Sequence, residues 1–298
     1  MELWPEASKS YWKNEDFFKS GEWIRGYVHE NYDFGLHAHE FYELNLVLKG
    51  SGVHRMGTKQ YAISEGDVFV IPPNIRHSYS STGHPDVYHL LIHRDFFARY
   101  AVELGVLPGY TMLFSVEPQL RMRDSGNTAP LCFLHLDERH FQKLMPVLQL
   151  IVDLTYDKRP EKVVMENALA LYTVIFLCRN YREQYLQVYS ESPDRFSVMA
   201  ACMEEIELRF AEKIRVEELA HRNGMSRSTF LREFRSLTGQ TPAEYLLNRR
   251  LAQAKMLLRS NKKIAEIAQD CGFYDSAHFI RFFERETGQT PSEFRRHV

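Results

Sequence analysis

The sequence predicts a multidomain α+β protein, with an N-terminal antiparallel β-barrel, a helical hairpin in the middle and an all-helical C-terminal domain of two helix-turn-helix units. Three observations support this fold class. Residues 21–93 alternate short runs of β-forming residues with glycine and proline turns, which is typical of a small barrel or sandwich. Residues 138–184 carry apolar residues at helical spacing. Residues 216–294 contain two copies of one helical pattern.

The predicted domain boundaries lie where these patterns change. The chain has 298 residues, of which 44% are hydrophobic and 26% charged, and it is long enough for two domain cores. Residues 1–105 form the barrel and end in a first helix, Asp95–Leu104. Residues 106–190 form the helical segment, and residues 196–298 form the C-terminal domain after the polar linker Ser190–Arg195.

Targeting and redox signals are weak throughout the chain. The N-terminus lacks the basic region and apolar run of a signal peptide. The longest apolar stretch, Ala168–Cys178, is shorter than the roughly 20 residues that a membrane span needs. The four cysteines are scattered without paired spacing, which predicts neither disulfides nor a cysteine zinc site. We therefore expect a cytoplasmic protein with no membrane partner.

The helical segment follows a loop-rich passage over residues 105–130. It consists of two apolar-periodic stretches, Glu138–Tyr156 and Glu161–Gln184. Their apolar stripes exceed what one short hairpin needs, and two interpretations stay open: packing against the barrel, or the interface of a homodimer. The stripe of the first stretch consists of Leu144, Leu148, Ile151 and Val152.

The C-terminal domain contains an internal repeat. Phe230–Tyr245 recurs as Phe279–Phe294, 49 residues later, and both copies contain the five residues TGQTP. Upstream, Glu218–Gly224 matches Glu266–Gly272 at an offset of 48, so the second copy has one inserted residue. An identical run of this length at matched spacing indicates a duplicated structural unit.

Each copy predicts two helices joined by a tight turn. In the first copy, helix Val216–Arg222 is followed by Gly224, which tolerates the left-handed conformation, and Ser226 caps a second helix, Arg227–Leu237. Each TGQTP then starts a further helix with a threonine cap, a proline in the first turn and a glutamate that closes a capping box. The counterparts in the second copy are Ile264–Asp270, Gly272, Asp275 and Ser276–Glu286.

Basic residues gather in the same region. The chain as a whole has a net charge of −2, whereas residues 196–298 hold 17 Lys and Arg against 14 Asp and Glu. Between Arg222 and Lys263 there are 10 basic residues and two acidic ones. Such a local excess is typical of a surface that faces phosphates. Helical hairpins used only for packing would not need it.

These features resemble the AraC/XylS family of bacterial transcription regulators over about residues 198–298. The segments that carry the resemblance are LAHRNGMSRSTFLREFRSLTGQTPAEYLLNRRLAQAKMLL and IAEIAQDCGFYDSAHFIRFFERETGQTPSEFR. The resemblance implies that one long helix, Pro242–Leu258, joins the two units and lets both reading helices enter adjacent major-groove segments of double-stranded DNA. The family's base-contacting positions correspond to Ser228, Leu231 and Arg232 in the first unit and to Ser276, Ala277, Ile280 and Arg281 in the second.

Arginine is the side chain that reads guanine with two hydrogen bonds. We therefore expect Arg232 and Arg281 to supply most of the direct readout, while the apolar positions contact thymine methyl groups. Four further arginines are expected to hold phosphates: Arg227, Arg235, Arg249 and Arg250.

The predicted barrel carries histidines at the spacing of the two cupin motifs. Side chains two apart on a strand face the same way, so His37, His39 and Glu43 converge on one face, and His77 joins them from a facing strand. Asn74 stands where the second motif usually has glycine, and its usual asparagine after His77 is missing. The glycine and proline positions of the motifs are Gly50, Gly66 and Pro72.

Three interpretations of this cluster stay open. The four side chains line an effector pocket or support the barrel; they bind zinc, nickel or ferrous iron, for which three histidines and a glutamate are suitable ligands; or they belong to a metal-dependent cupin enzyme fused to a DNA-binding domain. AraC-type regulators with this barrel carry the same HxH…E pattern without catalysis. We therefore do not expect an enzyme.

The resemblance also implies that the barrel senses a small molecule. The HAHEFYEL start and the late His77-Ser-Tyr79 are similar to those of rhamnose- and other sugar-responsive members, so a carbohydrate is the expected effector. We expect a homodimeric activator that contacts RNA polymerase, in preference to a co-regulator that acts through protein contacts alone. The candidate effector-binding residues are Trp23, Arg25, His37, His39, Phe41, Glu43, Asn45 and His77.

Overall fold

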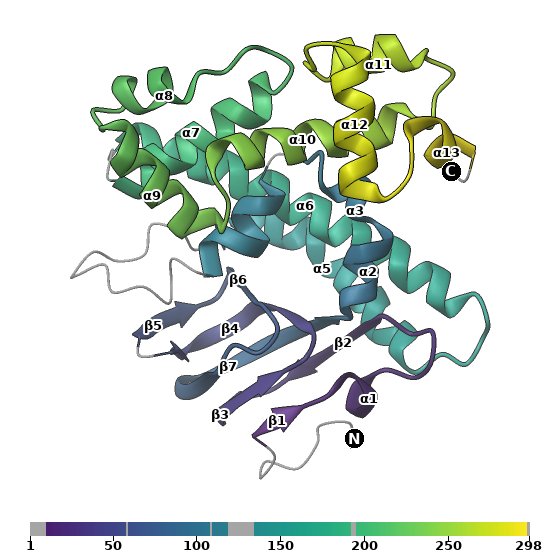
Figure 1. Ribbon diagram of the computed structural model, residues 1–298. Coiled ribbons are helices and arrows are strands. Elements are labelled where there is room, and N and C mark those ends of the chain that lie inside the picture. The colour runs from purple at the N-terminus through teal and green to yellow at the C-terminus, as the bar shows by residue number, and fades with distance from the viewer. Residues whose placement is uncertain (1–9, 58, 108, 119–133, 192–194, 297–298) are drawn as a thin grey trace. The chain divides into compact units, whose positions relative to one another are not determined.

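The computed structural model describes residues 10–57, 59–107, 109–118, 134–191 and 195–296 (Figure 1). The chain divides into two compact units. The sheet unit contains Met1–Arg99 and Thr111–Tyr185, and the helix-turn-helix unit contains Tyr100–Tyr110 and Leu186–Val298. Most of the predicted helical segment therefore belongs to the same unit as the strands.

The sheet unit is built on an eight-stranded sheet. Six of the strands follow one another in the order β1-β3-β7-β4-β6-β8, and the other two pair at the side, β2 with β7 and β5 with β4. All these pairs are antiparallel except β1 with β3. The long strands β4 and β7 each pair with three neighbours, so they connect the whole sheet. The strands are β1 (Tyr11–Trp12), β2 (Ile24–His29), β3 (Phe34–His39), β4 (Tyr42–Met56), β5 (Lys59–Ser64), β6 (Asp67–Ile71), β7 (His77–Ile92) and β8 (Leu134–His135).

Both faces of the central strands are buried. On β4, Glu43 and Asn45 alternate with Leu44, because successive side chains of a strand point to opposite faces, and all three are at most 1% exposed. Gly26 of β2 packs so closely on helix α5 (Glu138–Thr155) that an added Cβ would lie 2.8 Å from the Ile151 side chain. Helix α5 therefore covers one face, and the polar side chains point to the other.

Short helices flank the strands of this unit. The predicted first helix, Asp95–Leu104, is in fact two helices, because the backbone of Tyr100 is not helical (φ −102°, ψ 16°). The passage predicted as loop-rich, residues 105–130, contains the helical turn η1 (Met112–Val116), and its residues from 119 onward lie outside the described residues. The short helices are α1 (Asn14–Phe17), α2 (Arg94–Arg99), the π-helical turn η1 (Met112–Val116) and, in the other unit, α3 (Ala101–Leu104).

The predicted helical hairpin consists of α5 (Glu138–Thr155), which Asp137 caps, and α6 (Lys162–Glu191). The predicted linker overlaps the end of α6, and residues 192–194 lie outside the described residues. The predicted stripe of α5 faces inward: Leu144, Leu148 and Ile151 are fully buried and Val152 is half-buried.

Helix α6 has two apolar faces. By length and composition alone, Lys162–Gln184 is apolar enough to cross a membrane, a test that the core helix of a soluble protein also passes. The inward face is completely buried at Ala170, Val174 and Leu177, which favours a core helix. The outward face carries Val164, Met165, Tyr172 and Ile175, which are 71%, 43%, 47% and 40% exposed.

Glu166, on the inward side of α6, makes the stability of the sheet unit pH-dependent. Burial raises the pKa of this carboxyl from 4.5 to about 7, against the opposing charge of Lys162, whose Nζ lies 3.8 Å away. The folded state thus holds a proton that the unfolded state releases above pH 4.5. Its contribution to the free energy of unfolding is complete below pH 4.5 and is lost as the pH rises to 7.

We expect Glu166→Gln to flatten the fall in unfolding free energy between pH 5 and 7, by at most about 1.4 kcal/mol per pH unit, the limit for one proton. Urea titrations followed by tryptophan fluorescence test this, because the three tryptophans, Trp4, Trp12 and Trp23, all belong to the sheet unit. The exposed Glu161→Gln is the control. An unchanged slope in Glu166→Gln contradicts the prediction.

The helix-turn-helix unit contains the two predicted copies within one or two residues of the expected bounds. The caps are also confirmed: Thr241 Oγ1 accepts from the Glu244 backbone N–H, and the Glu244 carboxylate accepts from the Thr241 backbone N–H in return. Glycines in the left-handed conformation, Gly239 and Gly288, end the two reading helices. The helices are α7 (Arg195–Arg209), α8 (Val216–Arg222), α9 (Arg227–Thr238), α10 (Pro242–Leu257), α11 (Ile264–Asp270), α12 (Ser276–Thr287) and α13 (Pro291–Arg296).

Helix α3 and the two residues after it pack on α10, the helix that joins the two copies. Glu103 Oε1 accepts a hydrogen bond from Arg259, just beyond α10, at 2.5 Å. At Gly105, an added Cβ would lie 3.2 Å from the Cβ of Ala252. A segment that precedes the C-terminal domain by about 90 residues thus forms part of the same unit.

Candidate functional site

The first helix-turn-helix presents its arginines at the surface. The turn between α8 and α9 contains Gly224 with φ 65°, and Ser226 Oγ accepts from the Thr229 backbone N–H at 3.2 Å, as the sequence predicted. The predicted contact residues of α9 lie on its outer side, where Arg227, Ser228, Arg232 and Arg235 are exposed and Leu231 is half-buried.

Two of these arginines have acidic neighbours. Arg227 Nε lies 2.7 Å from Glu217 Oε1, and Arg232 Nη2 lies 3.3 Å from Glu233 Oε1. The two arginine side chains are 62% and 70% exposed. Exposed ion pairs contribute only about 0–1 kcal/mol, so either guanidinium can exchange its carboxylate for a phosphate or a base.

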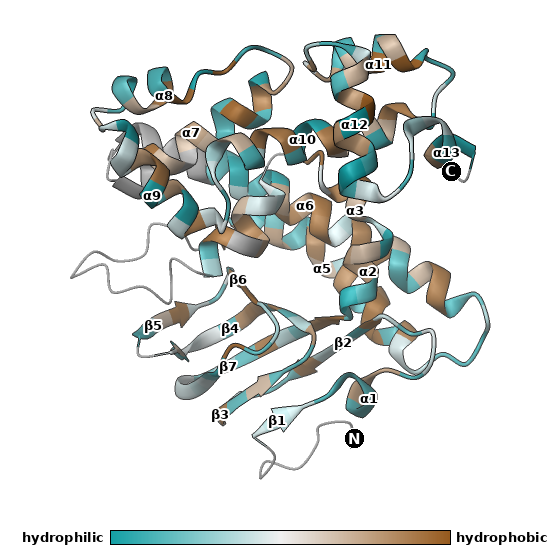
Figure 2. Ribbon diagram, in the orientation of Figure 1, coloured by the Kyte–Doolittle hydropathy of each residue, from teal (hydrophilic) through white to brown (hydrophobic). Residues whose placement is uncertain are grey.

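The second helix-turn-helix repeats this arrangement. An added Cβ on Gly272 would collide with the carbonyl oxygen of Ala211, so this turn requires glycine. Asp275 Oδ1 accepts from the His278 backbone N–H at 2.6 Å and caps α12. Hydrophobic and hydrophilic residues both occur along α12 (Figure 2), and its three phenylalanines, Phe279, Phe282 and Phe283, are buried. Of the predicted reading residues, Ala277 and Arg281 are exposed and Ser276 and Ile280 are half-buried.

The structure contradicts the prediction that Arg249 holds a phosphate, because this side chain is buried, whereas Arg250 is half-buried and its predicted phosphate contact stays a prediction. The Arg249 side chain is 7% exposed, and its Nε donates to Glu207 Oε2 at 2.7 Å. Its guanidinium also lies 4.2 Å from the centre of the Phe210 ring. Arg250 donates to the backbone carbonyls of Phe210 and Glu212 at 2.7 and 2.8 Å. Both arginines hold α10 to α7 and the turn after it.

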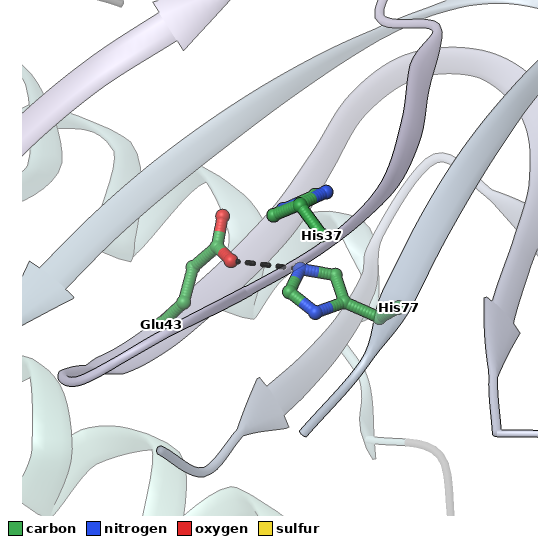
Figure 3. Close-up of side chains that lie close together, drawn as sticks. All are labelled: His37, Glu43 and His77. Atoms are coloured by element: carbon green, nitrogen blue, oxygen red, sulfur yellow. Dashed lines mark hydrogen bonds and ion pairs between the residues drawn. The ribbon is translucent and has the colours of Figure 1, made fainter. Parts of the chain in front are cut away.

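The sheet unit brings the predicted histidines and glutamate together. Ligand atoms of His37, Glu43 and His77 all lie within 4.8 Å of one another, and all three side chains are 0% exposed. In Figure 3 the Glu43 carboxylate points towards the rings of His37 and His77, and Glu43 Oε2 lies 3.2 Å from His77 Nε2. His39 Nε2 lies 3.0 Å from the same oxygen. The three histidines come from β3 and β7, and the glutamate from β4 rather than from the strand of His37 and His39.

The proton on each of these histidines is placed by a backbone carbonyl. Nδ1 of His37, His39 and His77 lies 2.8, 2.7 and 3.0 Å from a carbonyl oxygen. A carbonyl oxygen can only accept, so Nδ1 donates in each case and a neutral ring has a lone pair at Nε2. The carbonyls belong to Gly35, Phe41 and Ile75.

Burial determines the charge of the cluster. Desolvation lowers the pKa of His37 to about 3 and lowers that of His77, although the nearby Glu43 carboxylate opposes the shift. Burial alone would raise the pKa of Glu43, but its contacts with His39, His77 and His89 hold it well below the ordinary range. The interior therefore contains a carboxylate close to two imidazoles, those of His37 and His77, that resist protonation.

The departure from the second cupin motif has a structural explanation. Asn74 has φ 66°, in the left-handed region that favours glycine and that asparagine tolerates better than most residues. Its side chain also accepts a hydrogen bond from Tyr11 at 2.7 Å. The turn that leads to His77 is thus kept without glycine.

The other predicted effector residues are more dispersed. Asn45 is fully buried and donates to the Tyr79 hydroxyl at 2.7 Å, and Phe41 stacks on His39 with ring centres 4.5 Å apart. Arg25 is 8% exposed, and Trp23 precedes β2 and is half-buried. Asn45 and Phe41 thus lie beside the cluster. Among the contacts of the described residues, none joins Trp23 or Arg25 to His37, His39, Glu43 or His77.

Two protein-family models match the chain: an AraC-like ligand binding domain over residues 25–142 and a helix-turn-helix domain over residues 219–297. The chain belongs to the AraC family of transcription regulators. The predicted fold class and the predicted function as a DNA-binding regulator are therefore confirmed.

Relatives of this AraC-family chain match it along most of its length. It is 27% identical over 263 residues to the HTH-type transcriptional activator RhaS of Pectobacterium carotovorum, covering 88% of each chain. It is 27% identical over 261 residues to the activator RhaR of Yersinia pseudotuberculosis, covering 87% of this chain and 83% of the relative. Among solved structures, an AraC-type regulator from Chromobacterium violaceum is 29% identical over 33% of this chain and 89% of its own, with a TM-score of 0.31.

Three residues that the structure makes conspicuous were not singled out in the sequence analysis: one in the histidine cluster and two in the helix-turn-helix unit. His89 Nδ1 lies 2.7 Å from Glu43 Oε1, and a histidine within the apolar run of β7 was the available signal. Glu207 is the buried partner of Arg249 and stands on the apolar side of α7, beside Ile206. Tyr274, in the turn before α12, is 92% exposed, which is unusual for so large a ring.

Proposed function

We propose that this regulator activates transcription in response to a carbohydrate that binds in the sheet unit. The observation that carries the DNA-binding part is the pair of capped, glycine-hinged helices, α9 and α12, with Arg232 and Arg281 at their surfaces. The activator role is supported by relatives that are described as activators. The carbohydrate is supported by the resemblance of the His37–Leu44 segment to sugar-responsive members.

Selection from a random DNA pool tests this proposal directly. The full chain is incubated with the pool, bound fragments are sequenced, and the selection is repeated with a panel of sugars. We expect one motif with two half-sites read by α9 and α12, and a change in its affinity of about 5- to 150-fold with one sugar, as allosteric coupling usually gives. A motif whose affinity no sugar alters would refute the carbohydrate effector and leave the DNA-binding function standing.

We propose a binding role rather than catalysis for the barrel, with the chain acting in the cytoplasm beside the DNA and RNA polymerase. This is supported by the regulators among its relatives and by the complete burial of His37, Glu43 and His77. The alternative, a metal-dependent cupin enzyme, predicts turnover of a sugar by the purified chain. Product formation that His77→Gln abolishes would favour it.

We propose that α6 forms the interface of a homodimer. The outward face of a surface helix is normally polar, whereas that of α6 is apolar at Val164, Met165, Tyr172 and Ile175. Contiguous exposed apolar residues usually mark an interaction surface. The inward face packs in the sheet unit, in line with the first of the two sequence-based interpretations, and we propose the second, a homodimer interface, for the outward face.

Charged substitutions on the outward face are expected to separate the dimer. We expect Tyr172→Glu combined with Ile175→Glu to halve the molar mass measured by light scattering, because buried charges without partners disfavour association. Leu36→Glu, which alters an exposed apolar residue of β3 (49% exposed), is the control and should stay dimeric. A monomeric wild type, or a dimeric double variant, contradicts this interface.

A further inference from the structure

We infer that the sheet unit holds one divalent first-row transition-metal ion, with His37, His77 and Glu43 as ligands and His39 as the fourth. This site is independent of the effector's identity and of DNA binding. It follows from the positions of the four side chains relative to one another.

The arrangement lacks the protons that ordinary hydrogen bonds would need. The Nδ1–H groups of His39 and His77 are used by the carbonyls of Phe41 and Ile75. In a neutral ring, Nε2 then turns a lone pair towards Glu43 Oε2, which lies 3.0 Å from His39 Nε2 and 3.2 Å from His77 Nε2, and a carboxylate also only accepts. Acceptors that face one another are repelled unless a cation lies between them. A metal ion in this position would accept the lone pairs of both rings and of the carboxylate.

His37 adds an independent observation. Its Nε2 is buried and has no hydrogen-bond partner, while its Nδ1 donates to Gly35 O. The ring centre of His37 lies 4.0 Å from that of His77. A buried nitrogen without a partner is costly, by about 1–3 kcal/mol. A metal ion near Glu43 would satisfy this lone pair together with the two others.

The surroundings are those of a metal centre. Ligating histidines usually donate their second N–H to a carbonyl or carboxylate, and this fixes the ring and the protonated nitrogen. Here three carbonyls do so. His89 Nδ1 lies 2.7 Å from the other carboxylate oxygen, Glu43 Oε1, and orients it.

The ligand set defines the class of ion. Imidazole nitrogens suit zinc, iron, nickel and copper, whereas calcium and magnesium prefer oxygen. A divalent ion would pair with the Glu43 carboxylate and accept the lone pairs of the imidazoles, so that no buried acceptor is left facing another. We therefore expect zinc, nickel or ferrous iron, bound between β3, β4 and β7.

The test measures metal in the full chain purified without a histidine tag or chelator. We expect mass spectrometry to find about one transition-metal ion per chain, and removal with EDTA to lower the melting temperature of the sheet unit by tryptophan fluorescence. Adding Zn²⁺, Ni²⁺ or Fe²⁺ should restore it, because a ligand that binds only the folded state stabilises that state. Co²⁺ in their place should give the visible absorption bands of a nitrogen-coordinated ion.

Variants distinguish the residues that bind the ion from those that only lie near it. His37→Gln and His77→Gln should weaken ion binding at least about tenfold, and His89→Phe by roughly 10- to 100-fold, as outer partners of ligands do. His54→Gln is the matched control, since His54 is equally buried but stacks on Phe69 and Tyr79. If the ligand variants do not fold, the ion binding of the wild type, His54→Gln and His89→Phe still tests the site. A folded wild type that binds none of these ions, or a His77→Gln protein that binds them as tightly, overturns the site.

Discussion

Arg232→Ala is expected to weaken binding to the selected DNA motif by roughly 5- to 150-fold, while binding to unrelated DNA changes little. The range corresponds to the 1–3 kcal/mol that one bidentate arginine–guanine contact contributes against a wrong base. Arg232 lies on the exposed side of α9, and the pairing with Glu233 that it gives up is exposed and weak. Arg281, at the matching position of α12, should behave in the same way.

Electrophoretic or anisotropy titrations with matched and mismatched duplexes at one salt concentration measure this effect. The two arginines belong to separate copies, so their free-energy losses should add in Arg232→Ala/Arg281→Ala. Arg235→Ala is the control: a phosphate contact lowers affinity for all sequences and reduces the salt dependence by about one ion. If Arg232→Ala weakens all sequences equally, Arg232 does not read a base.

Glu207→Ala is expected to destabilise the helix-turn-helix unit by about 3–5 kcal/mol, because it leaves the Arg249 guanidinium buried without a counter-ion. The pair is 7% and 10% exposed, and Glu207 also accepts from the Tyr245 hydroxyl at 2.6 Å. Glu207→Gln keeps an acceptor for Tyr245 and should cost less. Circular dichroism at 222 nm during urea unfolding reports the helices of both units. Tryptophan fluorescence reports the sheet unit alone, because the helix-turn-helix unit contains no tryptophan, and the comparison of the two signals identifies the transition of the helix-turn-helix unit.

The exposed pair of Arg227 and Glu217 provides the comparison, since its N–O distance is also 2.7 Å. Glu217→Ala should cost less than about 1 kcal/mol, because solvent screens an exposed pair. Equal losses in Glu207→Ala and Glu217→Ala would mean that the burial of Arg249 does not decide its energetic role.

The helices of the C-terminal unit could be predicted from the sequence because their signals are local. Ser226 and Asp275 cap helices, Gly224 and Gly272 turn the chain, and the repeat confirmed each assignment with a second copy. The histidine cluster could be predicted in part, since alternation along a strand gives the face of each side chain. The strand change between His39 and Glu43 could not, because it depends on the turn between them.

Side chains whose role depends on a distant partner could not be assigned. Arg249 looks like any surface arginine until α7 places Glu207 beside it, 42 residues earlier in the chain. His89 joins the cluster only through the pairing of β7 with β4, which sets it opposite Asn45. A local excess of basic residues does not show which arginines are exposed to solvent and which form contacts between helices.

The contact between residues 101–106 and α10 bears on where the DNA-binding part can be cut from the rest. A fragment that begins at residue 196 retains every helix of both copies but loses the carbonyl of Val106, which accepts from Arg249 at 3.5 Å, and the partner of Arg259. It also uncovers the surface around Ala252. This compact unit is thus discontinuous along the chain, and truncation at residue 196 separates α10 from residues that contact it.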